Sequence, residues 1–116
     1  MLWLEQSTAA TVAIGPAVDI TDGVTPVTGL ASGTVDEVGV YKAGGTTLTD
    51  LSGTAITHRA GGIYTIPLPT GAVDTIGPLV FYVRDDDVCL PIRHEFMVVP
   101  SNVYNLLVDG AGSPWA

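Results

Sequence analysis

The chain has 116 residues, of which 47% are hydrophobic and only 14% are charged, and its formal net charge is -8. This negative charge repels phosphate backbones and anionic lipid surfaces, so neither nucleic-acid nor membrane partners are expected. A small domain with so few charged residues leaves apolar surface that a partner protein can cover, which favours a subunit of an assembly.

Short β-strands are predicted along most of the chain, because its 14 glycines and 8 prolines separate short apolar runs. The first strands are expected at residues 11–15 and 36–42, and a glycine-rich turn follows the second of them. A hairpin is expected next, with strands at residues 54–58 and 63–68 and a turn at residues 59–62.

The most regular β-pattern lies in residues 77–84. There the side chains at positions 79, 81 and 83, which are all large and apolar, alternate with those at positions 80, 82 and 84. A single helical turn is expected before this strand, at residues 70–75. After it, three aspartates at residues 85–87 form a predicted hairpin turn, which leads into a long strand at residues 88–99.

A short amphipathic helix is predicted after Pro100, where the β-rich sequence ends. Ser101 or Asn102 can cap this helix. A helix of this length is not stable alone, so it is expected to dock on another surface. The chain is therefore divided into a β-sandwich at residues 1–100 and a short helix with an extended docking tail at residues 101–116.

These elements indicate an all-β fold, an immunoglobulin-like or jelly-roll antiparallel β-sandwich, because short strands recur at regular spacing. Three prolines, Pro67, Pro78 and Pro91, are expected at strand ends, at sheet edges or at bulges. The one cysteine, Cys89, cannot form an intrachain disulfide and is expected to be a buried, inert thiol. The first residues lack the features of a signal peptide, and no apolar run is long enough to span a membrane.

No metal, cofactor or catalytic activity is predicted from the titratable residues. The aspartates at residues 85–87 could gather a calcium ion, but no further spaced ligands accompany them, so a turn is favoured. Residues 19–23 are likewise interpreted as a capped turn. His58 and His94 each lack a second ligand at the spacing of a zinc site. No pattern indicates a nucleophile, a base and oxyanion donors together, so an enzyme is not expected.

Aromatic and leucine side chains near the two ends of the chain are the candidate docking residues. Trp3 and Trp115 lie outside the predicted sandwich, and large aromatic residues are frequent anchors of protein interfaces. The predicted helix adds Tyr104, Leu106 and Leu107. The aromatic residues of the predicted strands are spread over many strands, so they are interpreted as core and not as a sugar-binding row.

Two segments resemble a group of tailed-bacteriophage virion proteins. The first is Gly-Pro-Ala-Val-Asp-Ile-Thr-Asp-Gly at residues 15–23, and the second is Phe-Met-Val-Val-Pro-Ser-Asn-Val-Tyr-Asn at residues 96–105. The shared module of these proteins begins and closes with similar motifs, and the resemblance extends to about residue 107. Longer relatives continue into fibre-like sequence, whereas only a short tail follows the motif here, which favours a compact docking module over a receptor-binding fibre.

The resemblance implies a structural component of a phage virion, made in the host cytoplasm, and it carries over no catalytic residue. We expect a capsid decoration or cement protein that binds the major capsid protein in many copies or as a homo-oligomer. One alternative is an adaptor in the tail, neck or baseplate that anchors a fibre and contacts tail or neck proteins. Another is a carbohydrate-binding adhesion module, which requires an exposed aromatic platform.

Overall fold

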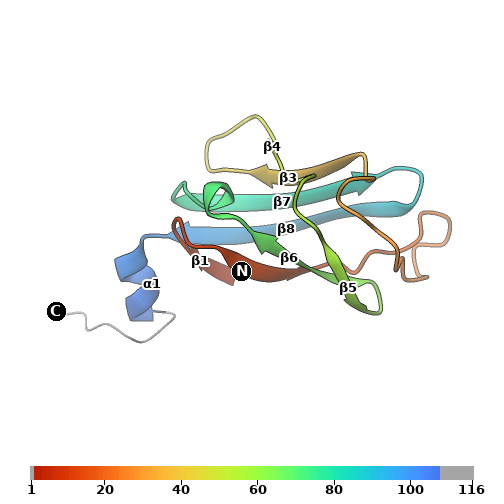
Figure 1. Ribbon diagram of the computed structural model, residues 1–116, viewed down its shortest axis with the longest axis horizontal. Coiled ribbons are helices and arrows are strands. Elements are labelled where there is room, and N and C mark those ends of the chain that lie inside the picture. The colour runs from red at the N-terminus through yellow and green to blue at the C-terminus, as the bar shows by residue number, and fades with distance from the viewer. Residues whose placement is uncertain (1, 108–116) are drawn as a thin grey trace.

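The computed structural model describes residues 2–107, which form mainly β-strands (Figure 1). The strands are β1 (Leu2–Glu5), β2 (Ala10–Ile14), β3 (Glu37–Tyr41), β4 (Thr49–Asp50), β5 (Thr57–Ala60), β6 (Ile63–Leu68), β7 (Gly77–Asp85) and β8 (Cys89–Val99). A 3-10 turn, η1 (Thr70–Ala72), precedes β7, and a helix, α1 (Ser101–Leu107), follows β8. The predicted β-rich class, the helical turn and the helix after Pro100 are confirmed.

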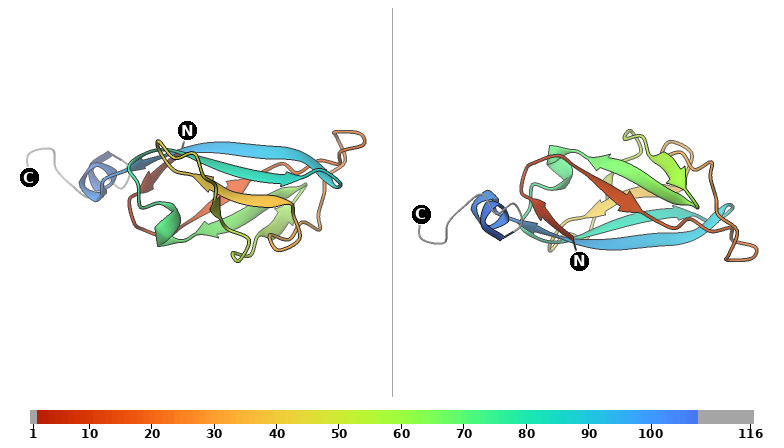
Figure 2. Two further views of the ribbon diagram at one scale, coloured as in Figure 1. Left: turned by 90° about the horizontal axis from the view of Figure 1, so that it is seen from above. Right: turned by 90° about the horizontal axis from the view of Figure 1, so that it is seen from below.

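The strands form two sheets that lie over one another as layers (Figure 2). The larger sheet has the strand order β1-β8-β7-β3-β4, and the smaller sheet has the order β2-β6-β5. Buried side chains of both sheets form one hydrophobic core, which includes Phe81 of β7 and Tyr64 and Ile66 of β6. The arrangement agrees with the predicted β-sandwich.

The hairpin of β7 and β8 contains the two longest strands and follows the predicted alternation. Leu79, Phe81 and Val83 of β7 point into the core and are at most 1% exposed. Val80 and Tyr82 point to the other face of the sheet and are half-buried. The turn between β7 and β8 begins one residue later than predicted. Its first expected residue, Asp85, still belongs to β7 and pairs with β8.

Strand β1 corrects two expectations. It pairs in parallel with β8, with Trp3 opposite Met97, so the sandwich is not wholly antiparallel. Trp3 therefore lies on an edge strand of the larger sheet and not outside the sandwich. Leu4 is the buried residue that fixes β1 on the core, opposite Val98 of β8. A strand of four residues with a single buried side chain carries too little periodicity to be recognised in the sequence.

The second hairpin also differs from its prediction. β5 begins at Thr57 and extends to Ala60, whereas a strand at residues 54–58 was expected. Gly61 and Gly62 both have positive φ, 60° and 86°, so a tight turn follows directly after Ala60. The short strand β4 was not predicted either, because two residues give no pattern.

The three prolines occupy the positions expected of them. Pro67 lies opposite Thr11 of β2, beyond the part of β6 that pairs with β5. Pro78 lies before the part of β7 that pairs with β3. Pro91 lies where the register of β7 and β8 shifts, between Ile92 and Cys89. At such positions a missing backbone N–H removes no ladder hydrogen bond from a central strand.

A buried tyrosine holds the long segment between β2 and β3 against the smaller sheet. The hydroxyl of Tyr64 donates a hydrogen bond to the carbonyl of Val27 at 2.6 Å. It also accepts a hydrogen bond from the N–H of Leu30 at 3.0 Å. Since Tyr64 is 1% exposed, these two bonds satisfy polar groups that water does not reach.

Helix α1 continues from β8 and contacts β1 (Figure 1). Its first hydrogen bond runs from the N–H of Tyr104 to the carbonyl of Pro100 at 2.9 Å. Pro100 therefore occupies the capping position, and the predicted cap at Ser101 or Asn102 is wrong. No residue of the helix is buried, so its apolar side chains remain partly exposed.

Candidate functional site

The face of the larger sheet that points away from the core carries an unusual set of side chains. Alternation in the strands and their register place these residues together on this outer face. The outer-face residues include Trp3, Glu37, Tyr41, Pro78, Val80, Tyr82, Arg84, Arg93, Glu95 and Met97. Tryptophan, tyrosine, methionine and arginine are the residue types enriched in binding surfaces.

The strand register orders these residues in rows across the sheet. Val80 of β7 lies between Tyr41 of β3 and Glu95 of β8. In the adjacent row, Tyr82 of β7 lies opposite Arg93 of β8. Tyr41 and Tyr82 thus lie on neighbouring strands, on the same face of the sheet and offset by one row.

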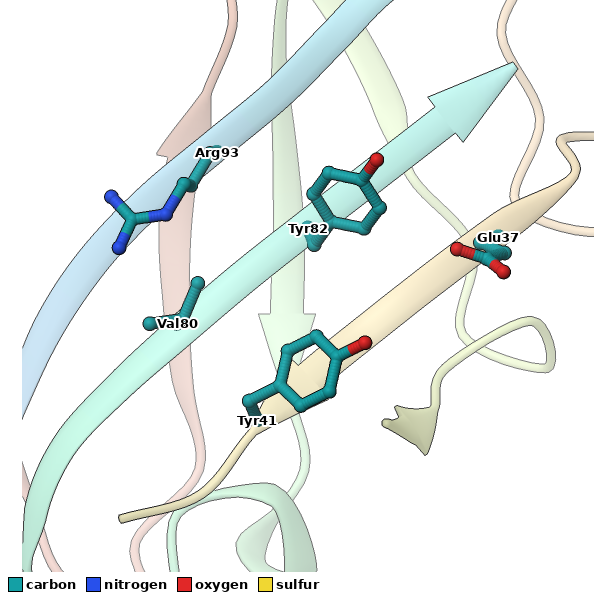
Figure 3. A pocket seen from close by; sticks show the side chains of 5 residues that line it. All are labelled: Glu37, Tyr41, Val80, Tyr82 and Arg93. Atoms are coloured by element: carbon teal, nitrogen blue, oxygen red, sulfur yellow. The ribbon is translucent and has the colours of Figure 1, made fainter. Parts of the chain in front are cut away.

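A pocket of about 420 Å³ opens on this face and is lined by Glu37, Tyr41, Val80, Tyr82 and Arg93 (Figure 3). In the close-up, both tyrosine rings extend along the sheet toward the Glu37 side, and the Arg93 side chain extends the opposite way. Within residues 2–107 neither phenolic hydroxyl makes a hydrogen bond to another side chain or to the backbone. The pocket therefore offers two aromatic rings and unsatisfied polar groups to solvent.

Both arginines of the outer face are paired with carboxylates. Arg93 pairs with Glu95 at 2.6 Å, and Arg84 lies 3.6 Å from Glu37. Glu5 of β1 and Asp50 of β4 lie on the same face by the strand register, so the face keeps a small excess of negative charge. The Glu37 carboxylate is the main cause of a raised pKa of Arg84, which keeps that guanidinium charged.

An acidic cluster lies beside the outer face, at the turn between β7 and β8. Carboxylate oxygens of Asp36, Asp85 and Asp86 lie within 4.8 Å of one another. Asp36 joins the cluster from the segment before β3, a contact that the sequence did not indicate, whereas Asp87 is not part of it. Arg84 lies 3.8 Å from Asp36 and 3.6 Å from Asp86, so an arginine already balances part of this charge.

The two carboxyls that meet in this cluster differ in acidity. Hydrogen bonding with Asp86 lowers the pKa of Asp36. The same contact raises the pKa of Asp86, and repulsion from Asp36 and Asp87 adds to that rise. Asp36 therefore stays ionised to lower pH than Asp86 does. Both groups are polar, as expected beside a turn between strands.

The predicted docking residues gather at the end of the sandwich that carries α1, except for Trp115, which lies outside the described residues. Leu107 is 62% exposed, and Tyr104 and Leu106 are half-buried on the helix. The helix contacts β1, whose Leu2 and Trp3 are also exposed. We call the exposed apolar residues of β1 and α1 the helix end.

The opposite end carries a second group of exposed apolar side chains, which the sequence did not single out. Its members are Ile20, Val24, Val88 and Leu90. Two hydrogen bonds join the loop that follows β2 to the β7–β8 turn. The N–H of Ile20 donates to the Val88 carbonyl at 3.2 Å, and the N–H of Leu90 donates to the Val18 carbonyl at 3.1 Å. We call this region the loop end.

Side-chain hydrogen bonds stiffen the loop end, as the predicted capped turn requires. The Asp19 carboxylate accepts a hydrogen bond from the N–H of Thr21 at 2.8 Å. The Asp22 carboxylate accepts from the N–H groups of Val24 and Thr25 and from the Thr25 hydroxyl. These bonds lower the pKa of Asp22 to about 2, and the Thr25 hydroxyl makes the largest contribution.

The two histidines form hydrogen bonds within the fold, and the cysteine is buried in it. Nε2 of His94 accepts a hydrogen bond from the N–H of Gly15 at 3.0 Å. Nε2 of His58 accepts one from the N–H of Gly62 at 3.2 Å. Cys89 is buried as predicted, and burial is the main cause of the raised pKa of its thiol. A protonated thiol inside the fold is a poor nucleophile.

The interpretation of the strand aromatics as core is wrong for two of them. Phe81, Tyr64 and Phe96 are buried, but Tyr41 and Tyr82 point outward. The signal was present in the sequence. Tyr82 neighbours the inward-pointing Phe81 on one strand, so the two rings must face opposite ways.

The chain matches no protein-family model and no curated protein. Within residues 2–107 no helix has the length and apolar character needed to cross a membrane. The remaining guides to function are the helix end, the loop end and the outer-face pocket.

Proposed function

We propose that the protein is a structural component of a tailed-bacteriophage virion, a capsid decoration or cement protein that docks through its helix end. The observation that carries this proposal is helix α1. Seven residues do not form a stable helix in isolation, and here the helix buries none of them completely. A partner that covers the helix would remove its apolar side chains from water and hold it in place.

The neighbouring edge strand enlarges the docking surface. Leu2 and Trp3 of β1 are exposed, and α1 contacts this strand. Leu107 adds the most exposed large side chain of the helix. A tryptophan and leucines at one corner give the kind of apolar centre that a protein interface needs. The resemblance of residues 15–23 and 96–105 to phage virion proteins makes the major capsid protein the first partner to test.

The strand order supports the immunoglobulin-like form of the sandwich for this proposal. The central strands of the larger sheet, β8, β7 and β3, follow the order of the three-stranded half of an immunoglobulin domain. The smaller sheet, β2-β6-β5, follows the other half without its first strand. Such a sandwich presents its loops at two ends, which suits attachment by one end.

Repetition over a shell lattice supplies avidity, so each single contact can be weak. No catalytic step is part of the proposal. The low proportion of charged residues fits this role. On a particle, neighbouring proteins would cover apolar surface that the isolated chain leaves exposed to water.

The test compares two substitutions at opposite ends of the sandwich. Leu107→Asp places a charge in the helix end, and Val24→Asp places the same charge in the loop end, where Val24 is 76% exposed. Each protein is added to particles that lack it, and bound copies are counted by quantitative mass spectrometry. We expect Leu107→Asp to lower occupancy at least tenfold and Val24→Asp to leave it near the wild-type level.

Equal occupancy of the wild-type protein and Leu107→Asp would show that the helix end is not the docking surface. The same count separates two positions on the particle. Copies in the hundreds support shell decoration, whereas a single symmetric ring supports the alternative, an adaptor in the tail, neck or baseplate.

A further inference from the structure

We propose that the pocket between Tyr41 and Tyr82 binds a neutral saccharide. The pocket lies on strands β3, β7 and β8, so the backbone holds its side chains in fixed positions. Its volume of about 420 Å³ lies within the range of small-molecule sites, roughly 300–1,000 Å³, and suits one or two sugar rings.

The two tyrosines supply the apolar part of such a site. Both are half-buried, so each ring is fixed by its neighbours while part of it remains open to solvent. The face of an aromatic ring carries partial negative charge, which attracts the polarised C–H groups on the flat side of a pyranose. Val80 lies on β7 opposite Tyr41 of β3 and two residues before Tyr82, so it completes an apolar floor.

The same pocket offers polar groups for sugar hydroxyls. The hydroxyls of Tyr41 and Tyr82 have no partner within the described residues, so each can donate and accept a hydrogen bond. The Glu37 carboxylate accepts hydrogen bonds, and Arg93, which is largely exposed, donates them. Alternating donors and acceptors around aromatic rings match the chemistry of a saccharide better than that of a purely apolar ligand.

Electrostatics favours a neutral ligand. Glu95 already binds the guanidinium of Arg93 at 2.6 Å, and Glu37 contributes a second carboxylate to the pocket. With a net charge of -8 over the whole protein, an anionic sugar or a nucleotide would meet repulsion. A peptide adding to the sheet would use a strand edge, whereas this pocket lies on the face of central strands.

The pocket lies apart from the helix end along the sheet. Trp3, which belongs to both the helix end and the outer face, pairs with Met97, and Arg93 precedes Met97 by four positions. At about 3.3 Å per residue this separation is about 13 Å along the strand. The saccharide proposal therefore does not depend on docking, and a protein held by its helix end would present this face to solvent.

The test uses the purified full chain. It is first applied to an array of neutral hexose and N-acetylhexosamine oligosaccharides, with sialylated and sulfated glycans on the same array. The strongest neutral binder is then titrated by isothermal calorimetry. We expect Tyr41→Ala and Tyr82→Ala to weaken binding at least about tenfold, because each removes one stacking face. Tyr41→Phe retains the ring and is expected to lose less.

Tyr104→Ala is the matched control, because it removes an aromatic ring from α1 and leaves the pocket intact. Its affinity is expected to equal that of the wild-type protein. The proposal is overturned if no neutral glycan binds, if only anionic glycans bind, or if the control weakens binding as much as the pocket variants. Thermal unfolding of each variant identifies any loss of binding that comes from misfolding, and Tyr41→Phe then decides the outcome.

Discussion

The two faces of strand β7 differ sharply although their residues alternate along one backbone. Leu79, Phe81 and Val83 are almost completely buried between the sheets, whereas Val80 and Tyr82 are half-buried on the outer face. The inner side chains stabilise the sandwich by leaving water. The outer side chains contribute less to folding, and so they are free to contact a ligand. A rigid binding face can thus be built on the back of a core strand.

The strongest test of this comparison is a pair of neighbouring substitutions. Phe81→Ala is expected to lower the free energy of unfolding by about 3–5 kcal/mol, because it removes a buried ring and leaves a cavity. Tyr82→Ala is expected to cost about 1 kcal/mol, since much of its ring already meets water. Urea denaturation of both variants measures the two losses.

One result for these two variants would contradict the difference between the two faces of β7. If Tyr82→Ala destabilised the protein as much as Phe81→Ala, the outer face would be a second core surface and not a free binding face. Similar m-values for both variants would show that the two losses can be compared directly.

Gly39 shows where the outer face is not open. A Cβ atom at this position would overlap the carbonyl oxygen of Thr49 and would lie 2.9 Å from Cγ of Leu48. Gly39→Ala must therefore push β4 away from β3, and we expect a loss of about 1–3 kcal/mol, as in other overpacked sites. Gly53→Ala is the control, because no atom lies within 4 Å of its added Cβ. Equal stability of the two variants would contradict the close approach.

The buried hydroxyl of Tyr64 provides a smaller test within the core itself. Tyr64→Phe removes the hydrogen bonds to the Val27 carbonyl and from the Leu30 N–H, and it leaves both backbone groups without that partner. We expect a loss of about 1–2 kcal/mol, less than the removal of a whole buried ring. Amide hydrogen exchange should show faster exchange at Leu30. Unchanged exchange there would mean that the hydroxyl does not hold the segment.

Sequence periodicity predicted the parts of the fold in which one face is buried. The alternation in β7 predicts the strand, its buried side chains and the hairpin to β8. It also contains the outward position of Tyr82, which is missed when the aromatic residues are interpreted from their spread over many strands and not from their strand face. A residue's neighbours on its own strand would have corrected that interpretation.

Long-range contacts could not be predicted from the sequence. Trp3 was expected outside the sandwich, but β1 is held by its parallel pairing with β8, whose residues lie more than ninety positions later. Asp36 joins Asp85 and Asp86, which lie 49 and 50 positions later in the chain. Such contacts depend on how the whole chain closes and leave no local pattern.

The loop end extends the comparison to a region that polar groups stabilise. The pKa of Asp22 is lowered from 3.8 to about 2, chiefly by the Thr25 hydroxyl. A group whose pKa falls on folding contributes stability above its unfolded value, and this contribution is lost as the pH falls from about 4 through 2. We expect Thr25→Val to raise the pKa of Asp22 toward 3.8, while the inner face of β7 remains unchanged. A carboxyl NMR titration measures the pKa of Asp22 in the wild-type protein and in Thr25→Val. An unchanged pKa of Asp22 in Thr25→Val would show that backbone N–H groups alone hold this loop, whereas a rise confirms that one exposed hydroxyl sets its acidity.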